Sequence, residues 1–193
     1  DFFYLFFYYF FLIYNNLHVD IVLEMFTITI KINYAILRYF NVCGASLSGK
    51  IGLITKGDHL FKNLSVALMK KKPIIKIYGN DYNTHDGSAI RDYIHVSDLA
   101  DVHLKILKKI SETMKSIIVN CGYYKGISVK EAVNEFKKQS KKKINILFKK
   151  RRPGDMEVII ANNTKLKKLI KWQPRYNKLS TIVKSCIEWE KKF

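Results

Sequence analysis

Cysteine and proline are scarce in this chain of 193 residues, which contains three of each. Cys43, Cys121 and Cys186 lie far apart, and no Cys-x-x-Cys spacing occurs. Zinc sites and disulfide frameworks use clustered or paired cysteines, so the pattern indicates neither and favours a reducing, cytoplasmic setting. His95 and His103 have no partner at ligand spacing. We therefore expect both to be structural and predict no metal site.

Acidic residues are also few, with 16 Asp plus Glu against 34 Lys plus Arg and a formal net charge of +18. Such a balance is compatible with a nucleic-acid partner. The lysines are spread in short runs, for example at 70–72 and 141–143, and such runs are more often solvated faces. The aromatic residues follow core spacing and form no stacking platform. We therefore predict no nucleic-acid partner.

The first 14 residues are apolar and aromatic, with no charge after Asp1. A membrane-spanning helix needs about 20 apolar residues. A signal peptide begins with basic residues, and an interfacial helix carries Lys or Arg on its polar face; neither pattern occurs here. We predict that residues 1–33 lie outside the native fold, as a frame-disrupted or non-coding translation, with a membrane anchor as the minor alternative.

Residues 78–96 attract attention because a polar loop rich in turn formers separates two strand-like ends. Gly, Asn and Asp tolerate the left-handed and Asx-turn conformations that such a loop needs. Arg91 lies at the base of the returning strand, where a guanidinium can reach a bound oxyanion. The alternative is a hairpin-like surface loop in which Arg91 pairs with a nearby aspartate: Asp81, Asp86 or Asp92.

Hydrophobic periodicity predicts the remaining elements. Apolar runs predict strands at residues 34–41, 73–79, 117–121 and 144–148. Apolar stripes at helical spacing predict helices at residues 59–71, 98–110, 128–139, 163–170 and 179–191. Asp58 and Ser97 are expected to cap the first two helices, and Ser128 with Glu131 forms a capping-box sequence for the third.

The run Gly-Asn-Asp-Tyr-x-Thr-x-Asp-Gly-x-x-x-Arg-Asp-Tyr-Ile-His-Val-x-Asp-Leu-Ala-Asp, from Gly79 to Asp101, resembles the UDP-glucose 4-epimerase family of extended short-chain dehydrogenases/reductases. The likeness extends from about residue 34 to the C-terminus. It implies an α/β fold with two parts: the late strands of a partial NAD(P)-binding Rossmann-type sheet, and a small C-terminal UDP-sugar-binding α/β domain. Residues 34–193 are then the C-terminal part of an epimerase, and residues 1–33 stay unassigned.

The resemblance also implies the chemistry. NAD accepts a hydride from C4 of the sugar while a Tyr takes the hydroxyl proton; the keto sugar then rotates, and the hydride returns to its opposite face. This is the interconversion of UDP-glucose and UDP-galactose in galactose metabolism. The alternatives are a related 4-epimerase acting on an N-acetylhexosamine or a pentose, and a non-catalytic UDP-sugar-binding fragment. Family members commonly form homodimers, but this chain by itself predicts no oligomeric state.

The resemblance assigns site residues as well. Phe40 would lie against the nicotinamide. The implied UDP-sugar contacts are Asn41, His59, Leu60, Lys76, Ile77, Tyr78, Arg91, Arg152, Gly154 and Asp155. Independently of the family, two arginines before a Pro-Gly turn can hold a diphosphate, and Asp155 can accept hydrogen bonds from ribose or sugar hydroxyls. The ordinary alternatives are turn, core or solvated roles for these residues.

The sequence departs from the family at several places. Lys62 stands where the family usually has Pro, and Ile159 stands where some members have Tyr. None of the nine glycines forms a Gly-x-x-Gly-x-x-Gly turn for a dinucleotide, and no Tyr is followed by Lys four residues later. A faint likeness at residues 22–25 would place Asn16 and Asp20 at the Tyr and Lys positions, where neither can do that chemistry. We therefore predict no catalytic residue in this chain and no activity by the chain alone.

Overall fold

The computed structural model describes residues 33–55, 57 and 59–193. The predictions for residues 1–32 and for Asp58 lie outside the described residues. The strands and helices follow one another along the chain in this order: β1 (Ala35–Tyr39), β2 (Asn41–Cys43), α2 (Leu60–Leu68), β3 (Ile74–Tyr78), β4 (Ile90–Arg91), β5 (Tyr93–His95), α3 (Val96–Thr113), β6 (Ile117–Cys121), β7 (Ile127–Ser128), α4 (Val129–Ser140), β8 (Asn145–Lys149), β9 (Val158–Ile159), α5 (Thr164–Ile170) and α6 (Leu179–Glu190). The predicted α/β class is confirmed.

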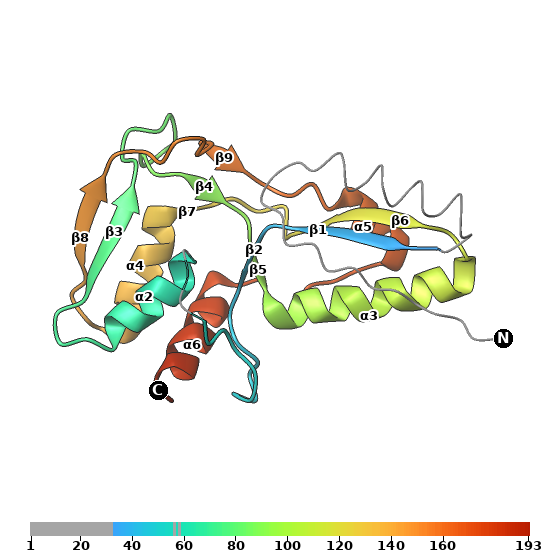
Figure 1. The fold of residues 1–193 in the computed structure, drawn as a ribbon, viewed down its shortest axis with the longest axis horizontal. Coiled ribbons are helices and arrows are strands. Elements are labelled where there is room, and N and C mark those ends of the chain that lie inside the picture. Colours follow the sequence, from blue (N-terminus) through green and yellow to red (C-terminus); the bar gives the residue numbers. More distant parts are fainter. Residues whose placement is uncertain (1–32, 56, 58) are drawn as a thin grey trace.

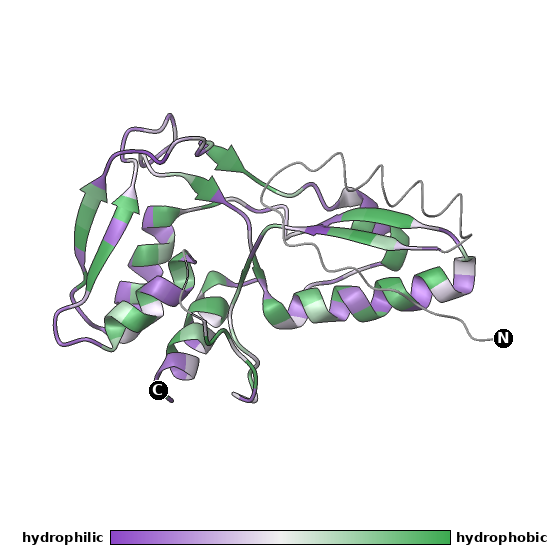
Figure 2. Ribbon diagram, viewed as in Figure 1, coloured by the Kyte–Doolittle hydropathy of each residue, from purple (hydrophilic) through white to green (hydrophobic). Residues whose placement is uncertain are grey.

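One end of the molecule is built on β1 and β6, which pair in parallel from Ala35 opposite Ile117 to Tyr39 opposite Cys121 (Figure 1). The long helix α3 packs against both strands. Its stripe of buried side chains includes Leu99, Val102, Ile106 and Ile110, and polar residues alternate with them along the helix (Figure 2). The strands predicted at residues 34–41 and 117–121 are therefore present, and they form one small parallel sheet.

The opposite end is built on β3 and β8, which also pair in parallel (Figure 1). Helix α2 packs against β3, and α2, α4 and α6 pack against one another. Phe61 of α2 lies at the centre of this cluster, with its ring 5.4 Å from that of Phe136 and 4.7 Å from that of Tyr93. Burial alternates along β3, as its sequence predicts, because only one face of the strand meets the helices.

Short strands join the two ends. β2 pairs in parallel with β5, while β4 lies between antiparallel β7 and parallel β9. Since β3 pairs with β8 and β4 pairs with β7 and β9, residues 78–96 do not form a hairpin. The loop instead carries the chain from the β3–β8 sheet to the centre of the molecule.

Helix starts show both successes and errors of sequence reasoning. The capping box at α4 is confirmed: the Ser128 side chain accepts from the Glu131 N–H, and the Glu131 side chain accepts from the Ser128 N–H. The prediction that Ser97 caps α3 is wrong. That helix begins at Val96, because the imidazole of His95 accepts a hydrogen bond from the Ser97 N–H. Helix α2 ends at Leu68, earlier than predicted, before the run of lysines that precedes Pro73.

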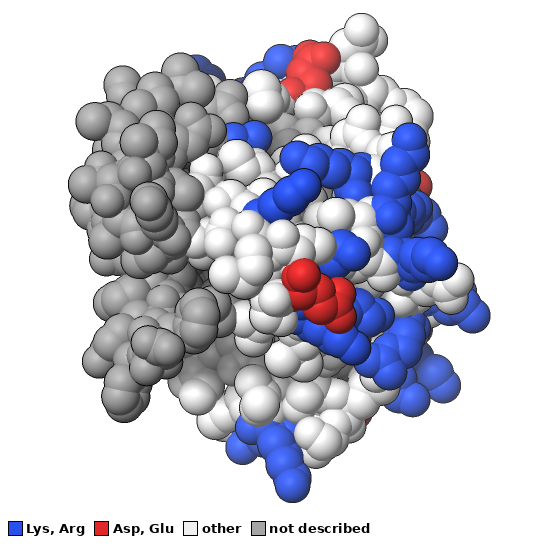
Figure 3. All heavy atoms as spheres, turned by 90° about the vertical axis from the view of Figure 1, so that its right-hand side faces the viewer, with Lys and Arg blue, Asp and Glu red and all other residues white. Residues whose placement is uncertain are grey.

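The three cysteines are free and buried. Within residues 33–55, 57 and 59–193, no three or more His, Cys, Asp or Glu side chains gather in a way that could hold a metal ion. No helix of the described part combines the length and apolar character needed to cross a bilayer. Lys and Arg side chains are spread in several groups over the face shown in Figure 3, with acidic side chains among them.

His95 is completely buried, and in the neutral form of its imidazole both ring nitrogens have hydrogen-bond partners. Its Nδ1 accepts from the Ser97 N–H at 3.1 Å, and its Nε2 lies 3.3 Å from Ser185 Oγ. Burial lowers the pKa of His95 below its usual value of 6.5, despite the opposing charge of Asp98. A proton on Nδ1 would also face the Ser97 N–H.

Lowering the pH is therefore expected to destabilise the fold through His95. The unfolded chain binds this proton near pH 6.5 and the folded chain only at lower pH, so the free energy of unfolding falls as pH drops below about 6.5. Urea unfolding at several pH values from 8 to 5 measures how steeply the free energy of unfolding depends on pH. His95→Gln should flatten this part of the profile, whereas His85→Gln, at an exposed loop position, should keep it. An unchanged profile in His95→Gln would contradict this assignment.

Candidate functional site

Two arginines from distant parts of the chain converge on one carboxylate. Arg91 lies in β4 with its side chain 12% exposed, and Arg152 lies in the loop between β8 and β9. Arg152 Nε donates to Asp155 Oδ2 at 2.9 Å, while Arg91 Nη2 lies 3.8 Å from Asp155 Oδ1. An oxyanion at this position meets two guanidinium groups, which is an arrangement suited to phosphate. We call Arg91, Arg152 and Asp155 the anion site.

Backbone contacts hold Arg91 in place. Its Nη1 donates to the carbonyl oxygens of Ile90, at 2.8 Å, and Glu157, at 3.3 Å. The strand beneath it is hydrogen-bonded on both sides, to β7 and to β9. A guanidinium fixed in this way loses little further conformational freedom when it binds a ligand.

A tight turn sets Arg152 and Asp155 side by side. The Asp155 N–H donates to the Arg152 carbonyl at 3.1 Å, with Pro153 and Gly154 at the two central positions. Gly154 has φ +79°, which a type II turn requires at its third residue and which side-chain-bearing residues rarely adopt. The sequence Arg-Pro-Gly-Asp thus encodes this geometry. Gly154 has a structural role here, and its contact with a ligand stays a prediction.

Tyr78, at the end of β3, borders the anion site. The Arg152 guanidinium carbon lies 5.2 Å from the centre of the Tyr78 ring, and Tyr78 is 40% exposed. A cation held against an aromatic face is oriented as well as attracted. Tyr78 therefore joins Arg91, Arg152 and Asp155 as predicted contacts that the structure brings together.

The neighbouring predicted contacts on β3 differ in accessibility. The Gly79 N–H donates to the Lys149 carbonyl, and the Pro73 carbonyl accepts from Asn145. In a parallel pair, every second residue of a strand directs its N–H and C=O groups to the neighbouring strand. Ile77 therefore also directs its backbone groups toward β8, while Lys76 directs its backbone groups to the opposite edge. The Ile77 side chain is 1% exposed. A ligand at that edge meets the backbone of Lys76 and Tyr78. The placement of Ile77 gives no support to its predicted contact with a UDP-sugar.

Asp92 organises the backbone behind the anion site. Its carboxylate is completely buried and accepts from the N–H groups of Tyr123 at 3.0 Å, Tyr124 at 2.9 Å and Ala161 at 3.2 Å. Burial raises the pKa of Asp92, although these N–H groups act in the opposite direction. The suggested pairing of Asp92 with Arg91 is therefore wrong. Asp92 instead ties the end of β4 to the segments that follow β6 and β9.

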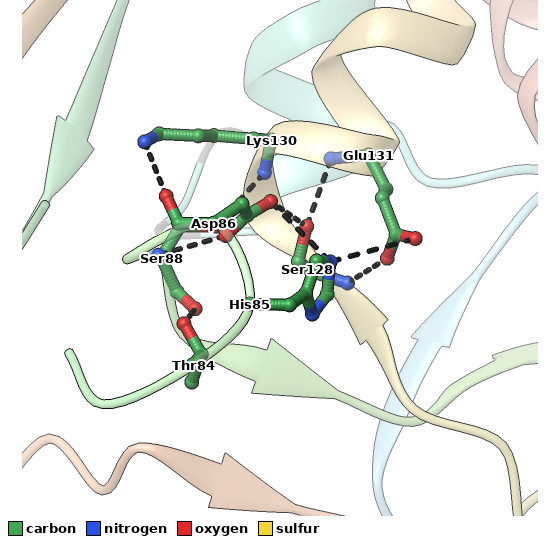
Figure 4. A network of polar contacts seen from close by, with 7 residues as sticks. All are labelled: Thr84, His85, Asp86, Ser88, Ser128, Lys130 and Glu131. Carbon is green, nitrogen blue, oxygen red and sulfur yellow. Dashed lines mark hydrogen bonds and ion pairs between the residues drawn. The ribbon is translucent and has the colours of Figure 1, made fainter.

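Asp86 anchors the loop that precedes β4 (Figure 4). One carboxylate oxygen accepts from the Ser88 N–H and hydroxyl at 2.8 and 2.7 Å, and the other accepts from the Ser128 hydroxyl. Lys130 Nζ donates to the Asp86 carbonyl. Burial would raise the pKa of Asp86, but the serine hydrogen bonds outweigh it and lower that pKa. The loop is thus fastened to the start of α4, which also leaves Asp86 engaged away from Arg91.

The first arginine of the Arg-Arg pair faces elsewhere. Arg151 Nε donates to Asp81 Oδ1 at 2.8 Å, and Nη1 lies 3.6 Å from Glu157 Oε1. The hydrogen bond from Arg151 lowers the pKa of Asp81. The expectation that Arg151 and Arg152 hold the anion together therefore needs correction, because of these two only Arg152 contacts Asp155.

The other predicted contacts lie on neighbouring elements. Phe40 is half-buried between β1 and β2. Asn41 begins β2, and its side-chain amide donates to the Asp92 carbonyl at 3.1 Å. His59 is exposed just before α2, and Leu60 begins that helix and packs against the core. These four stay predictions.

Two further features were not foreseen. A wide-open surface pocket of about 670 Å³ lies at the end of β6, lined by Asn120, Asn162, Thr164, Lys165, Lys168 and Leu169, and none of the predicted site residues lines it. Tyr82, in the loop before β4, is buried beside Arg151 with its ring centre 4.1 Å from the guanidinium carbon. The sequence signal for Tyr82 was an aromatic residue inside a loop of turn formers.

Comparison with known proteins places these features in a family. The model of the NAD dependent epimerase/dehydratase family matches residues 14–122, and so includes residues 14–33 as well. The UDP-glucose 4-epimerase of Azospirillum brasilense is 41% identical over 157 residues, which are 81% of this chain and 45% of that protein. The chain thus spans about half the length of the curated relatives it matches.

Solved structures agree. The UDP-glucose 4-epimerase of Stenotrophomonas maltophila, solved with bound NAD and formylated UDP-arabinopyranose, superposes with a TM-score of 0.85 at 30% identity, over 91% of this chain and 53% of that one. The UDP-Glc/GlcNAc 4-epimerase of Campylobacter jejuni gives a TM-score of 0.74 at 36% identity, over 90% and 53%. The predicted Rossmann-type α/β architecture and the family resemblance are confirmed. The chain belongs to the NAD dependent epimerase/dehydratase family.

Proposed function

We propose that this chain is the UDP-sugar-binding half of a UDP-glucose 4-epimerase and that it holds the diphosphate between Arg91 and Arg152. The observation that carries the proposal is the convergence of both guanidinium groups on Asp155. We assign to the phosphate oxygens the place that the Asp155 carboxylate oxygens occupy in the structure. The names of the relatives support UDP-sugar as the ligand class.

Binding requires an exchange of partners at the anion site. Phosphate oxygens displace the Asp155 carboxylate from Arg152, and the released carboxylate becomes an acceptor for ribose or sugar hydroxyls. Tyr78 flanks the bound nucleotide, and the backbone edge at Lys76, which no described strand pairs with, offers hydrogen bonds to it. Asn41, His59, Leu60 and Gly154 complete the proposed contacts from neighbouring segments.

The described residues do not fit NAD on their own. In the described part, β1 leads directly into β2 and β6 leads into β7, so neither strand is followed by a glycine turn that opens a helix. Such a turn is what holds the pyrophosphate of a dinucleotide. The sequence also lacks Tyr-x-x-x-Lys. Phe40 is the single proposed cofactor contact, and we propose that the chain alone binds UDP-sugars without epimerising them.

The identity of the sugar follows the relatives. UDP-glucose and UDP-galactose, and hence galactose metabolism in the cytoplasm, are the first proposal. The Campylobacter jejuni enzyme is named for UDP-Glc/GlcNAc, and the Stenotrophomonas maltophila enzyme was solved with a UDP-pentose derivative. An N-acetylhexosamine or pentose substrate is the alternative.

Calorimetry with the purified chain tests the proposal. UDP, UDP-glucose and UDP-galactose should each bind at a single site, UMP should bind at least about tenfold more weakly because it lacks one phosphate, and ADP should bind poorly. A coupled assay with added NAD should detect no interconversion of the two sugars. Absence of UDP binding would overturn the binding proposal, and turnover would overturn the proposed inactivity.

A further inference from the structure

Tyr82 has a buried hydroxyl that nothing in the described chain satisfies. The residue lies in the loop between β3 and β4, and it is 3% exposed. Among the described residues, no donor or acceptor reaches its hydroxyl oxygen. Native proteins pair almost all buried polar groups, because an unpaired one is costly. The hydroxyl of Tyr82 therefore needs a partner from outside the described residues.

The ring of Tyr82 is held where it is. A Cβ added at Gly79 would lie 2.2 Å from the ring, so the backbone at Gly79 is pressed against it. The Arg151 guanidinium lies over the ring, and Arg151 is itself anchored by Asp81. The Tyr82 N–H donates to the Gly87 carbonyl at 3.1 Å. With the ring fixed in this way, the hydroxyl cannot reach solvent by a simple rotation of the side chain.

Contacts through chain neighbours place the Tyr82 ring beside the anion site. The Gly79 backbone that presses against this ring directly follows Tyr78, whose ring lies under Arg152, and the Arg151 that covers it directly precedes Arg152. The charged groups that act on the phenol are Asp155, Arg151, Arg91 and Arg152. Burial is the largest cause that raises the pKa of Tyr82. The charge of Asp155 raises this pKa further, while the three arginines act to lower it. The phenol thus keeps its proton and is available as a donor.

We propose that the Tyr82 hydroxyl donates a hydrogen bond to a phosphate oxygen of the diphosphate held between Arg91 and Arg152. This rests on the proposed function of the same site. In the structure the two arginines face Asp155, and no described group reaches the hydroxyl. A phosphate that displaces Asp155 supplies this acceptor, so Tyr82 is a third ligand-binding group prepared by the fold.

Tyr82→Phe tests the proposal, because it removes the hydroxyl and keeps the ring between Gly79 and Arg151. UDP affinity should fall by about tenfold, the effect of one hydrogen bond to a charged group. Uridine affinity, followed by ligand-observed NMR, should stay the same because uridine has no phosphate. The melting temperature should stay the same or rise, since an unpaired polar group is removed.

Tyr123→Phe is the matched control. It also removes a buried tyrosine hydroxyl, but this one donates to Asp98 at 2.6 Å and accepts from the His95 N–H at 3.0 Å. This variant should melt at a lower temperature and bind UDP as the unmodified chain does. A double-mutant cycle with Tyr82→Phe and Arg152→Ala should show coupled losses of UDP affinity, as for two groups on one ligand.

The outcomes separate the two proposals. If the unmodified chain binds UDP and Arg152→Ala loses it, but Tyr82→Phe binds UDP normally, a trapped water satisfies the hydroxyl and this inference fails alone. If Tyr82→Phe weakens uridine as much as UDP, the hydroxyl does not address phosphate, and the inference also fails. If the unmodified chain binds no UDP, the proposed function fails and takes this inference with it.

Discussion

UDP binding is expected to weaken by roughly 100-fold or more when Arg91 and Arg152 are both replaced by alanine. Each guanidinium makes charge-assisted hydrogen bonds, which contribute about 1.5–3 kcal/mol, and 1.4 kcal/mol corresponds to a factor of ten. Each single replacement should therefore cost roughly tenfold or more. Calorimetry with UDP measures the losses, and the two arginines should be coupled because both address one group.

Arg175→Ala is the control for charge alone. Its guanidinium is 68% exposed and pairs with Asp101 at 3.7 Å on α3, away from the anion site. This variant loses the same unit of charge and should bind UDP within about twofold, because screening weakens distant exposed charges. Equal losses in Arg175→Ala and Arg152→Ala would mean that general positive charge attracts UDP, and the anion site would then have no special role.

The second large effect concerns a buried ion pair between α2 and α6. Lys62 Nζ lies 2.8 Å from Glu190 Oε2 and donates to the Leu53 carbonyl at 2.9 Å. The two side chains are only 7% and 9% exposed. Removing one member of such a pair leaves an uncompensated charge in the interior.

Lys62→Met is accordingly expected to lower the free energy of unfolding by about 3–5 kcal/mol. Replacing both members, in Lys62→Met with Glu190→Met, should recover most of this loss, because no buried charge then remains. Lys191→Met is the matched control in the turn that follows α6: its pair with Glu188 is over half exposed on both sides, so about 1 kcal/mol or less is expected. Urea unfolding measures the free energy of unfolding of the single variant, the double variant and the control. A single variant no worse than Lys191→Met would contradict the burial of this pair.

Lys62 also shows where sequence reasoning stops. A lysine in a basic chain suggests a solvated position, and the sequence shows only that Lys62 replaces the family's usual Pro. Its partner lies on the last helix, 128 positions away, and no local pattern connects the two residues. Only the packing of α2 against α6 turns this lysine into an interior residue.

Features that depend on residues close together in the sequence were predicted more reliably, because interactions between those residues determine them. Ser128 and Glu131 are three residues apart, and this spacing is sufficient for a capping box. Pro153 and Gly154 similarly dictate the turn that brings Arg152 beside Asp155. The alternation of β3 predicted which of its side chains are buried.

The orientation of neighbouring polar groups was beyond the sequence. Arg151 and Arg152 are adjacent and chemically identical, but the first binds Asp81 and the second binds Asp155. His95 took the capping role expected of Ser97, because its buried ring lies within reach of the Ser97 N–H. The hydrogen-bond partners of these residues depend on which distant segments the fold brings beside them, and a single sequence does not contain this information.

A crystal structure of the chain with UDP tests the central claim most directly. The account predicts that a phosphate lies between Arg91 and Arg152, that Asp155 has left Arg152, and that the Tyr82 hydroxyl is within hydrogen-bonding distance of a phosphate oxygen. UDP bound elsewhere, for example in the surface pocket beside Lys165 and Lys168, with the Arg152–Asp155 pair still closed, would contradict it.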